Sequence, residues 1–131
     1  MRYDPHREQD PKLWLTGDTE TRAREVDEYH RREGIRLPSP KLHAMFHVVA
    51  ENQVAMGDEY IAREVLERLM AEGLDRHQAI HAIMSVVAGH VHTTLKSSDG
   101  KDPAAVYREK LSCLTAEAWL KQEGRERPAT Q

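Results

Sequence analysis

Histidines recur at one-turn spacing in two separate parts of this sequence. The chain has eight histidines in 131 residues, and four of them form the pairs His43/His47 and His77/His81. If both stretches are helical, residues four apart lie on one face, so each pair can point two imidazoles at one ion. Glu51 continues the first pair at the same interval and adds a carboxylate. This spacing predicts a metal site with the ligands His43, His47, Glu51, His77 and His81.

The predicted ligand types limit the metal and its chemistry. Nitrogen and oxygen donors without sulfur suit zinc, iron, manganese, nickel or copper, and availability favours a divalent zinc or iron ion. Glu51 has three open roles: a ligand, a bridge between two metals, or an acceptor that orients His47. A metal with an open coordination position can activate water for hydrolysis, with Glu51 as the candidate catalytic base, or react with oxygen when reduced. A closed site would be structural.

These alternatives define two functional hypotheses. The first is a metal-binding helical protein that acts as a metal-dependent hydrolase or as an oxygen- or redox-active enzyme. The second is a non-catalytic helical interaction or oligomerisation module, whose histidines are structural or tune an interface near their ordinary pKa of about 6.5. The sequence does not decide whether the protein is an enzyme.

The remaining histidines are predicted to lie outside the site. His6 and His30 are expected to be plain surface residues, and His90 a residue on the flank of its helix. His92 lies on the same side as His81 but three turns away, too far to share its ion.

Capping residues and glycines divide the chain into predicted helices. These helices cover about residues 19–33, 40–56, 59–72, 76–96 and 103–122, and Gly124 is expected to end the last one. No stretch alternates as a strand would. Short connections favour antiparallel neighbours, so we expect an all-α fold, a compact bundle of about five helices.

A helical wheel places the predicted site at the edge of the core. The apolar centre of the 40–56 helix consists of Leu42, Met45, Phe46, Val49 and Met56. The apolar centre of the 76–96 helix consists of Ile80, Ile83, Met84, Val87 and Val91. Both sets of histidines lie on the same rotational side of these centres, so neighbouring parallel helices do not simply bring them face to face. Splayed packing, or a site completed across a dimer, would resolve this conflict.

Length and composition allow one helical domain over residues 1–131, with 1–17 as an N-terminal extension and 124–131 as a frayed tail. Trp14, with Leu13 and Leu15, is expected to anchor the extension onto the bundle. One cysteine, Cys113, excludes an internal disulfide and a Cys-rich zinc site, and fits a reducing compartment.

Charge and hydropathy limit the partners. A net charge of −3 gives no attraction to nucleic acid or anionic membranes. The most apolar stretch, residues 80–91, is too short to span a bilayer, which takes about 20 apolar residues. We therefore expect a cytoplasmic protein without nucleic-acid or membrane partners. The small-molecule substrate is unknown, and a homo-oligomer is one of the open assembly states.

A bacterial helical family of unknown function resembles this chain over about residues 39–92. That family carries the pattern HxxxHxxxExQ, followed by HxxxHxxM on a later helix, and the chain matches these patterns at residues 43–53 and 77–84, with Leu66-Glu67-Arg68-Leu69 between them. The resemblance implies that the five predicted ligands belong together. The chain departs from the family at Ser85 and Gly89, where acidic residues are expected, so a carboxylate-rich dinuclear site is not implied.

Overall fold

Helices account for the regular structure in the described part of the chain. The computed structural model describes residues 3–96 and 102–126, with the backbone alone at residues 58, 93–96 and 123–126. These residues form seven α-helices, one 3-10 helix and no strand, which confirms the all-α class. The helices are α1 (Pro11–Thr16), α2 (Thr19–Arg32), α3 (Pro40–Ala55), η1 (Gly57–Glu59), α4 (Ala62–Ala71), α5 (Arg76–Lys96), α6 (Pro103–Cys113) and α7 (Ala116–Glu126).

The predicted last helix is interrupted, which raises the helix count. Leu114 has extended backbone (φ −68°, ψ 132°), and the Thr115 hydroxyl accepts a 3.1 Å hydrogen bond from the Ala118 N–H. This side-chain cap starts α7 as a separate helix. Gly124 lies inside α7 instead of ending it, and residues 127–131 of the predicted frayed tail lie outside the described residues.

The N-terminal part of the chain is also more regular than predicted. Asp10 caps the short helix α1 by accepting from the N–H groups of Lys12 and Leu13, and the predicted extension therefore contains a helix. Trp14 is only 2% exposed, which confirms its role as an anchor. The predicted 59–72 helix is shorter than expected, because its first residues belong to η1 and α4 begins at Ala62.

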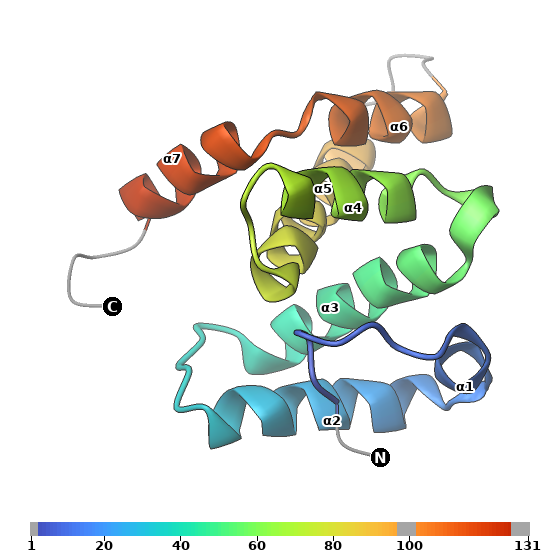
Figure 1. Ribbon diagram of the computed structural model, residues 1–131, viewed down its shortest axis with the longest axis vertical. Coiled ribbons are helices and arrows are strands. Elements are labelled where there is room, and N and C mark those ends of the chain that lie inside the picture. The colour runs from blue at the N-terminus through green and yellow to red at the C-terminus, as the bar shows by residue number, and fades with distance from the viewer. Residues whose placement is uncertain (1–2, 97–101, 127–131) are drawn as a thin grey trace.

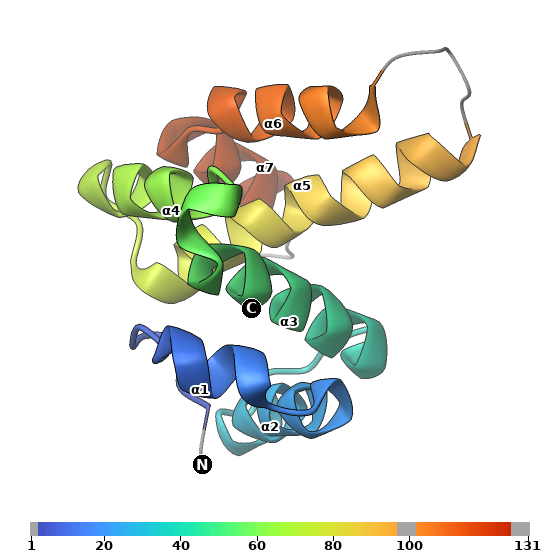
Figure 2. The same cartoon turned by 90° about the vertical axis from the view of Figure 1, so that its right-hand side faces the viewer.

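Helix α3 lies at the centre of the molecule. Figures 1 and 2 show it between α1 and α2 on one side and α4 and α5 on the other. Its Ala44 and Val48 pack in an apolar cluster with residues of α1 and α2 and with Tyr3 of the N-terminal segment, residues 3–10. Its Ala50 and Val54 pack in a second cluster built mainly from α4 to α7. One helix therefore supplies the core on both of its sides.

This central position corrects the predicted apolar centre of α3. Leu42, Met45 and Met56 are 54%, 42% and 40% exposed, whereas Phe46 and Val49 pack partly against the second cluster. A helix covered on two sides exposes the remaining face, here the one with bulky apolar residues. The deeply buried faces carry small aliphatic residues and the polar stripe.

The wheel prediction holds better for α5. Its residues Ile80, Ile83, Met84 and Val87 are buried, and only Val91 of the predicted centre is exposed, at 42%. Within the described residues, no helix combines the length and apolar character that crossing a membrane requires.

Candidate metal site

Four imidazoles from three helices converge in the interior. His30 of α2, His47 of α3, and His77 and His81 of α5 each offer one nitrogen, and these nitrogens all lie within 4.8 Å of one another. His30, His47 and His77 are 1%, 0% and 9% exposed, and His81 is partly buried. A single chain makes this arrangement, so bringing these groups together does not need a dimer. The four histidines can hold a metal ion.

The end of α2 brings His30 into the cluster. Gly34 has a φ of +71°, and the Ile35 N–H donates to the His30 carbonyl at 2.9 Å. This left-handed residue, which favours glycine, closes the helix and turns the chain back toward α3. The His30 ring then lies against the rings of His43 and His47, with centroid distances of 4.7 and 5.2 Å.

A reciprocal cap fixes the start of α5, where two of the histidines lie. The Gln78 N–H donates to Asp75 Oδ1 at 2.8 Å, and the Asp75 N–H donates to Gln78 Oε1 at 3.0 Å. His77 consequently stands in the first turn of α5, with His81 one turn later. Their ring centroids are 4.2 Å apart.

The hydrogen bond of His30 determines which of its nitrogens can bind an ion. Its Nδ1 lies 2.8 Å from the Val26 carbonyl oxygen. Because a carbonyl can only accept, Nδ1 carries the hydrogen, and in the neutral ring Nε2 keeps its lone pair. A lone pair on Nε2 is what a metal ligand requires.

Burial favours the neutral form of three of these imidazoles, those of His30, His47 and His77. It lowers the pKa of His47 well below its usual value of 6.5, with a further lowering by neighbouring histidines, above all His81. Burial also lowers the pKa of His30, and it lowers that of His77 from 6.5 to about 3. Neutral rings near pH 7 can donate lone pairs to a metal without first losing a proton.

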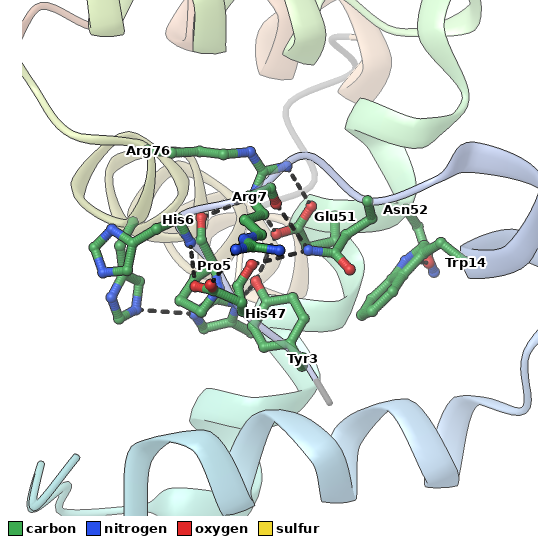
Figure 3. A network of polar contacts seen from close by, with 12 residues as sticks. Tyr3, Pro5, His6, Arg7, Trp14, His47, Glu51, Asn52 and Arg76 are labelled. Carbon is green, nitrogen blue, oxygen red and sulfur yellow. Dashed lines mark hydrogen bonds and ion pairs between the residues drawn. The ribbon is translucent and has the colours of Figure 1, made fainter. Parts of the chain in front are cut away.

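Glu51 belongs to a buried polar network that includes His47 (Figure 3). It is not part of the group of four histidines. Its two oxygens accept one hydrogen bond each from Arg76 of α5, both at 2.8 Å. Oε2 also accepts from the Tyr3 hydroxyl at 2.5 Å. The same hydroxyl lies 3.0 Å from His47 Nδ1, which connects the network to the cluster. Arg76 donates in addition to the Pro5 carbonyl at 2.9 Å.

The structure and the sequence prediction share three histidines, His47, His77 and His81. His30, predicted to lie on the surface, is buried in the cluster, so that prediction was wrong. His43 stands next to the group, with its Nε2 3.3 Å from His30 Nε2, but is not one of the four.

Two further residues beside the site, Tyr3 and Arg76, were not predicted. Tyr3 lies in a segment without helical periodicity, and Arg76 next to His77 had no visible partner in the sequence. The position of Arg76 directly after the Asp75 cap was the one available signal, since it placed this side chain in the same turn as His77.

No protein-family model, curated protein or solved structure matches this chain. The resemblance to a family with the HxxxHxxxExQ pattern therefore stays a prediction. The geometry of the four histidines and their surroundings is the basis on which a function can be assigned.

Proposed function

We propose that the protein binds one divalent transition-metal ion through His30, His47, His77 and His81. The observation that supports this is the convergence of their four nitrogens within 4.8 Å. Metal–nitrogen bonds of about 2.0–2.1 Å in a tetrahedral site separate the nitrogens by about 3.4 Å. The Nε2 atoms of His47 and His77 already lie 3.4 Å apart. The other pairs lie within 4.8 Å, so binding an ion would draw these nitrogens closer together.

The ligand set favours zinc or iron(II). Magnesium and calcium prefer oxygen ligands, whereas neutral imidazoles suit zinc, iron and their neighbours in the first transition row. Four imidazoles complete the tetrahedral set that zinc takes in closed sites. We therefore propose zinc as the first candidate, held in a closed binding site.

The environment of Glu51 argues against the hydrolase hypothesis. A hydrolytic base must be available to a metal-bound water. Both oxygens of Glu51 already accept hydrogen bonds from Arg76, and one of them also accepts from Tyr3. We propose that Glu51 supports the site as a hydrogen-bond acceptor and is not its catalytic base.

An oxygen- or redox-active iron enzyme is the second candidate. Iron(II) commonly takes more than four ligands, so the same imidazoles would leave coordination positions open. A pocket of about 500 Å³ beside the cluster supports this candidate. Among its lining residues, His6 and Tyr29 contact the ring of His77, with centroid distances of 5.4 and 5.6 Å. None of the four proposed ligands lines this pocket, so a substrate held there would reach the ion only past the rings of His6 and Tyr29.

Metal analysis of protein purified without an affinity tag or chelator tests the proposal. We expect about one zinc or iron ion per chain, as a single tetrahedral site requires. A content below roughly 0.2 ion per chain, both as purified and after incubation with zinc or with iron(II) under anaerobic conditions, would contradict it.

Single substitutions separate the ligand set proposed from the structure from the one predicted from the sequence. His47→Ala and His81→Ala should abolish metal binding, because both sets contain these residues. His30→Gln should lose the metal and His43→Gln should keep it, whereas the opposite result would favour the predicted set. His92→Gln on exposed helix surface is the matched control.

A further inference from the structure

Tyr3 occupies the junction between the Glu51–Arg76 pair and His47 (Figure 3). Its side chain is 1% exposed, and its ring packs against Trp14 and edge-on against His47, with centroid distances of 5.5 and 5.4 Å. Its hydroxyl lies 2.5 Å from Glu51 Oε2 and 3.0 Å from His47 Nδ1. A buried hydroxyl with two partners has a fixed direction, since leaving either partner unpaired would cost free energy.

The partners of Tyr3 determine where the hydrogens lie. Glu51 accepts from the Arg76 guanidinium with both oxygens and accepts the Tyr3 hydrogen as well. The Tyr3 oxygen has then donated its only hydrogen, so His47 Nδ1 must supply the hydrogen of the remaining bond. His47 Nε2 keeps its lone pair, and this atom faces His77 across 3.4 Å, inside the cluster of four histidines.

We propose that Tyr3 is a positioning residue of the metal site: it selects the Nδ1–H tautomer of His47 and so leaves Nε2 to bind the ion. This inference rests on the proposed function. An acceptor behind a metal-bound histidine orients the ring and raises its basicity, and removing such an acceptor typically weakens metal binding by about 10–100-fold.

The same contacts connect the N-terminal segment to the proposed metal site. Tyr3, Pro5 and His6 precede α1, and each contacts an element that supplies ligands: Tyr3 bonds His47, Pro5 accepts from Arg76, and His6 lies against His77. Coupling between two equilibria is reciprocal. A segment that strengthens metal binding must itself be held more firmly when the metal is bound.

Two tyrosine substitutions test the positioning role. Tyr3→Phe removes the hydroxyl and keeps the ring, and we expect zinc affinity, measured near neutral pH by competition with a chromophoric chelator, to fall at least about tenfold. Tyr29→Phe is the matched control. Its ring also contacts His30 and His77, at 5.4 and 5.6 Å, but its hydroxyl makes no hydrogen bond to a histidine within the described residues. A loss smaller than tenfold for Tyr3→Phe, or an equal loss for Tyr29→Phe, would overturn the proposal.

The tautomer itself is a readout that a purely structural role would not change. NMR of the imidazole nitrogens in the metal-free wild type should find the His47 hydrogen on Nδ1, and Tyr3→Phe should move part of the population to the Nε2–H form. Weaker zinc binding with an unchanged tautomer would overturn the proposal, as would a hydrogen on Nε2 in the wild type. If the wild type binds neither zinc nor iron, the proposed function fails, and the NMR measurement still tests the hydrogen-bond chain alone.

Hydrogen exchange in the unmodified protein tests the reciprocal effect. The backbone N–H groups of His6 and Arg7 donate to Asp4, to its side chain at 2.9 Å and to its carbonyl at 3.1 Å. Zinc should slow the exchange of both groups, because the metal stabilises the segment that carries them. Unchanged exchange at saturating zinc would contradict the coupling.

Discussion

Two arginine–glutamate pairs in this protein use the same chemical groups in opposite environments. In the buried network, Arg76 and Glu51 are paired at 2.8 Å with side chains 5% and 1% exposed. In the exposed network, Arg68 and Glu72 are also paired at 2.8 Å, but with side chains 36% and 35% exposed. Each pair also makes hydrogen bonds to a segment that is distant in the sequence.

In both networks the arginine donates to a backbone carbonyl of the distant segment, and the glutamate accepts a hydrogen bond from the same segment. Arg76 donates to the Pro5 carbonyl and Glu51 accepts from Tyr3, which holds the N-terminal segment. In the exposed network, Arg68 donates to the Leu114 carbonyl at 2.6 Å and Glu72 accepts from the Ala116 N–H at 2.9 Å, which holds the junction of α6 and α7.

The difference between the networks lies in what can replace a lost partner. Water can hydrate the exposed charges, so each bond there contributes little. The buried side chains of Arg76, Glu51 and Tyr3 are at most 5% exposed, so solvent has little access to replace a lost partner. Each loss is then expected to leave a charge or a hydroxyl unpaired. The buried network should therefore control both stability and the orientation of His47.

The largest effect is expected from breaking the buried pair. Arg76→Met leaves the Glu51 carboxylate in the interior without its counter-charge, and we expect the free energy of unfolding to fall by about 3–5 kcal/mol. Urea denaturation of the metal-free protein, followed by circular dichroism, measures this change. If Arg76→Met lowers the free energy of unfolding no more than Arg68→Met does in the exposed network, the proposed difference between the two networks is refuted.

Acidification should lower the free energy of unfolding over different pH ranges in the two regions. The pKa of His77 is lowered from 6.5 to about 3, so below about pH 6.5 the unfolded chain takes up a proton that the folded chain does not. The free energy of unfolding therefore falls as the pH drops from 6.5 toward 3, and the lowered pKa values of His30 and His47 act in the same direction.

Glu72 contributes to stability over a different pH range. The Ala116 N–H and Arg68 lower its pKa from 4.5, so its contribution is present above that pH and lost as the pH falls below it. The urea midpoint of the metal-free protein should thus already decrease between about pH 7 and pH 5, where only the histidines act. A constant midpoint over that interval would show that the imidazoles are not buried as neutral groups.

The smallest effect is expected in the exposed network. Arg68→Met matches the first substitution chemically, but Glu72 stays hydrated, so the urea midpoint should move by only a small fraction of the shift seen for Arg76→Met. The change should be local, with faster hydrogen exchange at the Ala116 N–H. Global destabilisation comparable to that of Arg76→Met would mean that the α6–α7 junction is as critical as the N-terminal segment.

The boundaries of α2, α3 and α5, to within one residue, and three of the four clustered histidines could be predicted because they depend on local geometry. Residues four apart share a helix face wherever the helix lies, so His77 and His81 had to be neighbours once α5 formed. His30 could not be found this way. It has no second histidine on its own helix, and its burial depends on the turn at Gly34 that folds α2 against α3.

The surroundings of Glu51 were beyond the sequence for a related reason. Its stripe with His47 was visible, but its partners Arg76 and Tyr3 are 25 and 48 positions away, and no periodic pattern relates them. The wheel of α3 failed at Leu42 because a periodic pattern identifies faces without showing how many of them neighbours cover.

The placement of α3 between two apolar clusters has a consequence for cooperativity. The chain contains two tryptophans, and the clusters hold one each: Trp14 lies in the cluster with α1 and α2, and Trp119 in the cluster with α4 to α7. Removing either indole leaves a fluorophore that reports on one cluster alone. Coincident melting curves would indicate a single transition transmitted through the shared helix, whereas separate curves would reveal two folding units that the shared helix joins only loosely.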